Sequence, residues 1–264
     1  LADENGIFLF SPSSSAQAIS NHKHIFRNTL SVEYLGYKLA ERAYYDGIRK
    51  VTIINEFSSY TESYKKYFTE KFIELGGEVV SVDVFDSFED DLSFLYENIE
   101  KSDPDSIILF FQSYLSIKHF FLDLISTDID LPMYGGDLII NDLIVKDYME
   151  IMDGIKIVSM YHDESDNFNN LKNDSSEFAG FDIFENNNPA YLISSYESVY
   201  ILKYVIENFN CDIDDVNCIS NGFLKLDNFN SMLGNISFDK YGDVNLKPVI
   251  YELMRGEFIL LEND

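Results

Sequence analysis

The chain has 264 residues, 46% of them hydrophobic, so it can bury a sizeable core in one large domain or in two smaller lobes. Its 46 Asp and Glu residues outnumber its 19 Lys and Arg residues, and the net charge of −27 argues against nucleic acid and anionic membranes as partners. There is no run of about eighteen apolar residues, which argues against a transmembrane helix.

Strand and helix patterns alternate between residues 31 and 160. In chain order they predict a buried strand at 51–54, a helix with apolar residues at Tyr64, Phe68 and Phe72 that ends at Gly76-Gly77, a strand at 79–84, a helix over 92–99, a very apolar strand at 107–111, a helix over 117–124, and short strands at 132–134 and 155–159. Such a series forms a parallel sheet with helices on both faces. We therefore predict a doubly wound sheet, with a ligand expected at the loops after Ile54, Phe111 and Tyr134.

The rest of the chain is less regular. Residues 163–188 are rich in Asp, Asn, Ser and Glu and have little apolar period, which fits either a mobile surface loop or an irregular short helix. Helices are predicted over 192–206 and 216–226. Strands are predicted at 235–239, 249–253 and 258–261, separated by turns.

The sequence carries no motif of an enzyme or a cofactor site. It has no Gly-x-Ser-x-Gly elbow, no phosphate-binding loop and no Gly-x-Gly-x-x-Gly. His162-Asp163-Glu164 is a lone cluster, more typical of a surface segment than of a catalytic site. The cysteines and His22, His24, His119 and His162 form no ligand-spaced metal cluster. We therefore expect a protein that is not an enzyme and holds no metal or cofactor.

Several short patterns follow one another in a distinctive order. They are Phe10-Ser11-Pro12-Ser13-Ser14-Ser15, Ile25 to Thr29, Gly47 to Ile54 before Ser59-Tyr60, Pro132 to Asp137, and Phe238-Asp239-Lys240-Tyr241-Gly242-Asp243. This order resembles the leucine/isoleucine/valine-binding proteins of ABC transporters, which are type I periplasmic binding proteins. The resemblance covers nearly all 264 residues and depends on order and spacing, since each motif is weak alone.

The resemblance implies two doubly wound α/β lobes joined by three hinge strands. Lobe 1 would comprise residues 1–31 plus 161–235, and lobe 2 residues 32–160 plus 236–264. The family's first βα units precede the point that Leu1 to Ile7 matches, so lobe 1 is expected to lack its N-terminal βα units. Unpaired strand edges would then need a cover. We expect either a second chain, such as a homodimer partner, or a lobe 1 of different topology.

The resemblance also implies a ligand site between the lobes. Ser13, Ser14 and Ser15 match the loop that binds a ligand carboxylate, where a helix start would favour an anion; the alternative is an ordinary serine N-cap. Asp137 matches an acidic residue that faces the ligand ammonium, or else it caps the next helix. Tyr60 matches an aromatic residue over the ligand, or else it is a core or rim tyrosine. Gln112 and Ser113 are further candidates.

Cys211 and Cys218 are seven residues apart, which allows a local disulfide or two reduced thiols. The oxidising compartment that the resemblance implies favours the disulfide. The protein is then expected to be periplasmic or extracellular. A signal peptide or a lipid-anchored leader would lie upstream of Leu1, outside this sequence.

The function implied is capture of a small amino-acid-like ligand for the membrane subunits of an ABC transporter. Three alternatives stay open: a ligand-binding sensor domain of a membrane receptor, a doubly wound enzyme such as a hydrolase, and a truncated remnant that binds nothing. The ligand itself is open among polar or branched amino acids, small amides and carboxylates.

Overall fold

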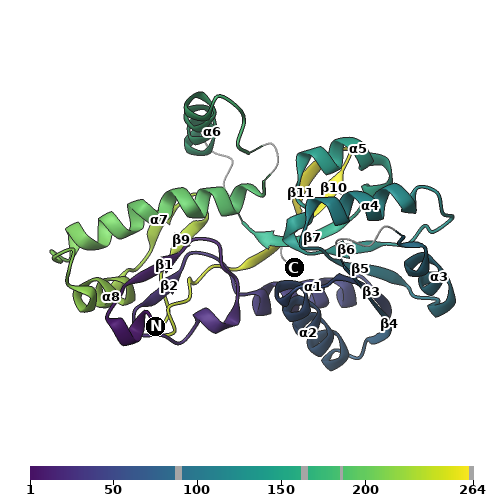
Figure 1. Ribbon diagram of the computed structural model, residues 1–264, viewed down its shortest axis with the longest axis horizontal. Helices are drawn as coiled ribbons and strands as arrows, with labels where there is room; N and C mark the ends of the chain where they lie inside the picture. The colour runs from purple at the N-terminus through teal and green to yellow at the C-terminus, as the bar shows by residue number, and fades with distance from the viewer. Residues whose placement is uncertain (87–90, 162–165, 185–186, 262–264) are drawn as a thin grey trace. The chain divides into compact units, whose positions relative to one another are not determined.

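A computed structural model describes residues 1–264 apart from 87–90, 162–165, 185–186 and 262–264 (Figure 1). The chain divides into two compact units. The first unit comprises Leu1–Ser31 and Met160–Pro248, and the second comprises Val32–Ser159 and Val249–Asp264. The chain therefore crosses between the units three times. The return to the first unit falls between Ser159 and Met160, at the start of the range 160–164 that the resemblance implies. The His162-Asp163-Glu164 cluster lies outside the described residues.

Residues 236–248 lie in the first unit, whereas the sequence assigned them to lobe 2. The reason is packing. Ile236, Phe238 and Val244 belong to the same buried cluster as Phe26, in the core of the first unit. The chain leaves this core only at Pro248, where the strand that enters the second unit begins.

The second unit contains one seven-stranded sheet. Its strand order is β11-β10-β7-β6-β5-β3-β4. The strands are β3 (Lys50–Glu56), β4 (Glu78–Phe85), β5 (Ser106–Phe110), β6 (Met133–Gly135), β7 (Lys156–Met160), β10 (Pro248–Met254) and β11 (Glu257–Leu261). Strands β4, β3, β5, β6 and β7 pair in parallel, while β10 and β11 are antiparallel. The predicted doubly wound α/β fold is confirmed, with an antiparallel hairpin added at one edge.

Five helices cover this sheet. They are α1 (Val32–Tyr45), α2 (Ser59–Glu74), α3 (Ser93–Ser102), α4 (Tyr114–Leu124) and α5 (Asp142–Met152). In Figure 1, α1 and α2 lie on one face of the sheet and α4 and α5 on the other. The adjacent residues Phe110 and Phe111 pack against helices on opposite faces of the sheet. The Phe110 ring packs 4.8 Å from Tyr64 of α2, and the Phe111 ring packs 5.5 Å from Phe120 of α4.

The first unit is built from short strands and three helices. Strand β1 (Leu9–Ser11) pairs in parallel with β2 (Ile25–Arg27), and β8 (Phe229–Ser231) forms a hairpin with β9 (Gly234–Ile236). The helices are α6 (Asp166–Ala179), α7 (Pro189–Asn208) and α8 (Val216–Lys225), with 3₁₀ turns η1 (Asp3–Asn5) and η2 (Gln17–Ile19). Helix α6 replaces the loop or short irregular helix predicted within 163–188. The strand predicted at 235–239 ends at Ile236, beyond which Phe238 makes an isolated bridge to Val244.

An aromatic cluster forms the core of this unit. The ring of Phe223 in α8 lies 4.9 Å from Phe26 and 5.1 Å from Phe238. A disulfide joins Cys211 to Cys218 next to this cluster, with 5.6 Å between their Cα atoms. This distance lies within the roughly 4.4–6.8 Å that disulfides span. The predicted bond is therefore present, and it ties the loop before α8 to the first turns of that helix.

A buried ion pair joins β2 to the turn at 238–243. The Nε of Arg27 donates to Oδ1 of Asp243 at 2.8 Å, and the Arg27 side chain is 0% exposed. The other guanidinium nitrogens donate to the Ala16 carbonyl at 3.0 Å and to the Ser20 hydroxyl at 2.6 Å. A Cβ at Gly242 would lie 2.2 Å from the Ile25 carbonyl oxygen, so only glycine allows this approach. Arg27 thus holds together three separate segments of the first unit.

This geometry makes Asp243 important for stability. Asp243→Asn keeps the shape but leaves the buried Arg27 charge uncompensated, so we expect the free energy of unfolding to fall by about 3–5 kcal/mol. Urea denaturation followed by circular dichroism measures the loss. The control is Glu97→Gln, which breaks the Lys101–Glu97 pair whose side chains are 69% and 66% exposed. It should cost at most about 1 kcal/mol. Similar small losses in both variants would contradict the expectation.

Candidate ligand-binding site

Four candidate residues of the second unit lie where parallel strands end. Because β3, β5 and β6 run in the same direction, their carboxyl ends meet at one edge of the sheet, the usual place for a ligand in such folds. Tyr60 follows β3, Gln112 and Ser113 follow β5, and Asp137 follows β6. The fold therefore brings these four candidates to one edge.

Tyr60 and Asp137 are in direct contact. The Tyr60 hydroxyl donates to Oδ1 of Asp137 at 2.5 Å, although 77 residues separate the two in sequence. Asp137 is 1% exposed and begins the 3₁₀ turn η3 (Asp137–Ile139). It is not the cap of α5, because Asn141 fills that role by accepting from the Leu143 and Ile144 N–H groups. A buried carboxylate held by a hydroxyl is thus placed at the carboxyl edge.

Two glycines precede Asp137 at the end of β6. A Cβ on Gly135 would lie 2.2 Å from Cδ1 of Ile139, so the Ile139 side chain would have to shift. The Gly136 N–H donates to the Leu109 carbonyl at 3.1 Å, which holds the turn against β5.

Gln112 and Ser113 are held by a residue that the sequence analysis missed. Glu56, the last residue of β3, is 2% exposed. Its Oε2 accepts from the Gln112 N–H at 2.6 Å and from the Ser113 N–H at 2.9 Å. In addition, the Ser58 hydroxyl donates to Oε1 of Gln112 at 3.1 Å. The signal available in sequence was an acidic residue at the end of a buried strand, directly before a loop expected to bind ligand.

The serine loop belongs to the first unit. Ser13 is exposed, Ser14 is partly buried and Ser15 is 6% exposed. The Ser14 N–H donates to the Ser11 hydroxyl at 3.3 Å, and the Ser194 hydroxyl donates to the Pro12 carbonyl at 2.6 Å. The expected helix start is wrong here. The loop is followed by the three-residue turn η2, whose N-cap position is Ala16. The serines of the loop therefore do not cap this turn. A turn of three residues also provides no helix dipole to favour an anion.

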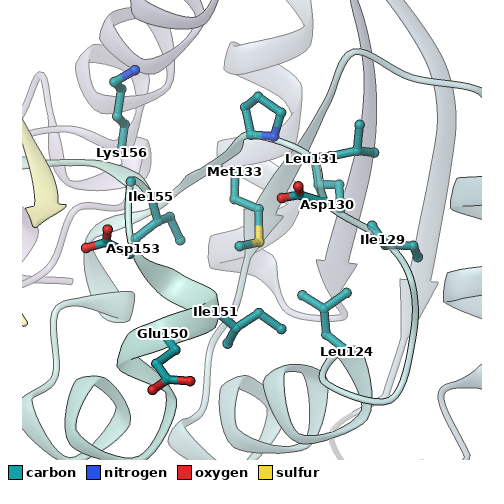
Figure 2. Close-up of a pocket in the computed structure, with 13 residues that line it drawn as sticks. Leu124, Ile129, Asp130, Leu131, Met133, Glu150, Ile151, Asp153, Ile155 and Lys156 are labelled. Atoms are coloured by element: carbon teal, nitrogen blue, oxygen red, sulfur yellow. The ribbon is translucent and has the colours of Figure 1, made fainter. Parts of the chain in front are cut away.

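A cavity of about 560 Å³ lies at the opposite edge of the sheet, where β6 and β7 begin (Figure 2). Figure 2 shows the apolar side chains of Leu124, Met133 and Ile151 directed into it, while the Glu150 carboxylate points away. Lys156 at its margin pairs with Asp46 at 2.9 Å. None of the candidate ligand residues lines this cavity. It therefore has no part in the candidate site.

In the part of the chain that the structure describes, no group of three or more His, Cys, Asp or Glu side chains could hold a metal ion. Within the same part, no helix is both long enough and apolar enough to cross a bilayer.

A family model described as "receptor family ligand binding region" matches residues 1–255. Since this match extends over nearly the whole sequence, the chain belongs to that family. No curated protein matches the chain.

Three solved structures share the fold. The leucine-binding protein LivK of Thermotoga maritima is 22% identical with a TM-score of 0.84, covering 99% of this chain and 74% of that one. LivJ of Streptococcus pneumoniae, solved with isoleucine, is 18% identical with a TM-score of 0.80, covering 99% and 74%. An R. palustris solute-binding protein solved with benzoate is 18% identical with a TM-score of 0.82, covering 98% and 71%. These matches confirm the type I periplasmic binding protein fold.

The Tyr60–Asp137 contact predicts a loss of stability when the hydroxyl is removed. Tyr60→Phe takes one donor from a buried carboxylate, so we expect the unfolding free energy to drop by about 1.5–3 kcal/mol, the range for a hydrogen bond to a charged group. Thermal and urea denaturation measure the change. Tyr45→Phe, at a residue that is 74% exposed, is the control and should change stability by at most about 0.5 kcal/mol. Equal stability of the two variants would show that the contact is not formed.

Proposed function

We propose that this protein is an extracytoplasmic solute-binding protein that captures a small amino-acid-like ligand for an ABC transporter. The observation that carries the proposal is the buried Asp137 carboxylate, held by Tyr60 at the carboxyl edge of a parallel sheet. Similar folds in LivK, LivJ and the R. palustris protein support solute binding, since their names or bound ligands are leucine, isoleucine and benzoate.

Asp137 is proposed to bind the ammonium group of the ligand. Burying a carboxylate is costly unless it is hydrogen-bonded or paired with a positive charge. The Tyr60 hydroxyl donates one hydrogen bond to this carboxylate. A ligand ammonium would donate charge-assisted hydrogen bonds, which are roughly twice as strong as neutral ones.

The serine loop is proposed to bind the carboxylate of the ligand. Hydroxyl and backbone N–H groups of Ser13, Ser14 and Ser15 are suitable donors for an anion. The loop is fixed on both sides, since Arg27 donates to the Ala16 carbonyl and Ser194 to the Pro12 carbonyl. A fixed loop loses little conformational entropy when it binds a ligand. Gln112 and Ser113 are proposed as further ligand contacts.

The proposed location is the periplasm or the cell exterior. The Cys211–Cys218 disulfide supports it, because disulfides persist in oxidising compartments and are rare in the cytosol. The proposed partners are a small-molecule ligand and the membrane subunits of the transporter. Binding without chemistry fits this assignment, and we propose no enzymatic activity.

A second candidate function is the ligand-binding domain of a membrane receptor. The family description, receptor family ligand binding region, favours it. Uptake of radiolabelled ligand by cells with and without the gene separates the two functions. Loss of uptake supports the transporter role. Unchanged uptake together with a lost response to the ligand supports the receptor role.

Asp137→Asn tests the proposed ammonium contact. The amide keeps the shape and can still accept from Tyr60, but it removes the negative charge. We expect the affinity for an amino acid to weaken by roughly 2–5 kcal/mol, as when one partner of a buried charged pair is truncated. Native mass spectrometry of the purified protein first identifies a co-purified ligand, and calorimetry then compares the variants. An uncharged amide ligand is the control and should be affected much less. Undiminished affinity for the amino acid would remove Asp137 from the site.

A further inference from the structure

We infer that Glu56 is a positioning residue: its buried carboxylate holds the loop of Gln112 and Ser113 in the conformation that the ligand requires. The inference depends on the proposed function for its effect on affinity. The ordering of the loop by Glu56 is inferred from the contacts of Glu56 alone, and it can be tested without a ligand.

One carboxylate oxygen of Glu56 accepts two hydrogen bonds. Oε2 accepts from two consecutive backbone N–H groups, at 2.6 Å from Gln112 and 2.9 Å from Ser113. Ser113 is the N-cap of α4 and also accepts from the Ser116 N–H through its hydroxyl. The Glu56 carboxylate therefore satisfies backbone donors at the start of α4.

The backbone of Glu56 holds the loop after β3, which leads into α2. Its carbonyl accepts from the Thr61 hydroxyl, and Thr61 forms the capping box of α2 with Ser58. Tyr60 lies between these two capping residues, and its hydroxyl reaches Asp137. One residue thus connects the loop after β3 with the loop after β5. The side chain acts on Gln112 and Ser113, and the backbone acts on the start of α2.

This arrangement makes Glu56 a positioning residue rather than a ligand contact. Its Oε2 accepts from two consecutive backbone amides of the loop after β5. The role needs an acceptor oxygen and not a charge, and a carboxamide oxygen has two lone pairs and can accept from both amides. The glutamine variant therefore separates positioning from direct binding of a cationic group.

The first measurement is hydrogen exchange at the Gln112 and Ser113 amides, followed by NMR in the ligand-free protein. In Glu56→Ala, which keeps the backbone contacts with Thr61, we expect both amides to exchange at least about tenfold faster. In Glu56→Gln, exchange should stay within about threefold of the wild type. Unchanged exchange in Glu56→Ala would overturn the inference.

The second measurement is calorimetric affinity for whichever common L-amino acid the wild type binds most tightly. We expect at least about a tenfold loss in Glu56→Ala and at most about threefold in Glu56→Gln. Equal losses in both variants would mean that the charge itself contacts the ligand, and this would overturn the inference. If the wild type binds none of these amino acids, the proposed function fails, while the exchange measurement still decides whether Glu56 orders the loop.

Asp83→Ala is the matched control for both measurements. Asp83 is also a buried carboxylate of the second unit, 7% exposed, and accepts from Asn98 Nδ2 at 2.6 Å and from Ser81 at 2.8 Å. It lies on β4, at the edge of the sheet, and the two partners of its carboxylate, Ser81 and Asn98, are not candidate residues. We expect it to lose stability but to keep affinity within about twofold. A loss of affinity equal to that of Glu56→Ala would show that destabilisation alone weakens binding, and this would overturn the inference.

Discussion

Phe110 and Phe111 are adjacent, and both are buried, on opposite faces of the sheet. A strand that must be covered on both faces needs helices on both sides, and parallel strands connected by such helices all end at the same edge. This constraint brings Glu56, the 112–113 loop and Asp137 together, although they are far apart in sequence. Burial of the central strand therefore determines where the candidate site lies.

In the first unit, a polar interaction determines how separate segments of the chain are positioned. Its described parallel sheet consists of β1 and β2, so hydrogen bonding between strands connects only a small part of this unit. Arg27 joins the loop at Ala16, the turn at Asp243 and strand β2 through its guanidinium group. Since a buried guanidinium has five donors in a fixed plane, it sets the relative positions of its acceptors more strictly than apolar packing does. The serine loop thus depends on a residue with no proposed ligand contact.

The sheet of the second unit could be predicted from sequence because its buried strands consist of apolar residues. The run at 107–111 is apolar throughout, as expected for a strand buried on both faces. Helix α6 was not predicted as a regular helix, because Phe168 is its one buried residue among those described and most of its residues are polar. The boundary at Pro248 was also missed. Phe238 was taken as part of a strand of lobe 2, but its ring packs on Phe223 in the core of the first unit.

The candidate site could be predicted only in part, because some of its contacts are made by backbone groups. Tyr60 and Asp137 were recognised because a resemblance to known binding proteins pointed to their positions, and the structure shows them in contact. Whether they bind a ligand stays a prediction. Glu56 was missed because its partners are backbone N–H groups 56 and 57 residues away. Backbone amides are the same in every residue, so the sequence can show an acidic residue at the end of a strand but not which backbone groups it binds.

The net charge of −27 has little influence on which ligand is bound. A zwitterionic amino acid carries no net charge, so the long-range field of the protein does not attract it, and that field is screened beyond about 8 Å at physiological ionic strength. An acidic surface disfavours polyanionic partners. For the proposed ligand, selection is expected to come from buried groups, where screening is weak. Asp137, at 1% exposure, is such a group, and the many exposed carboxylates are not.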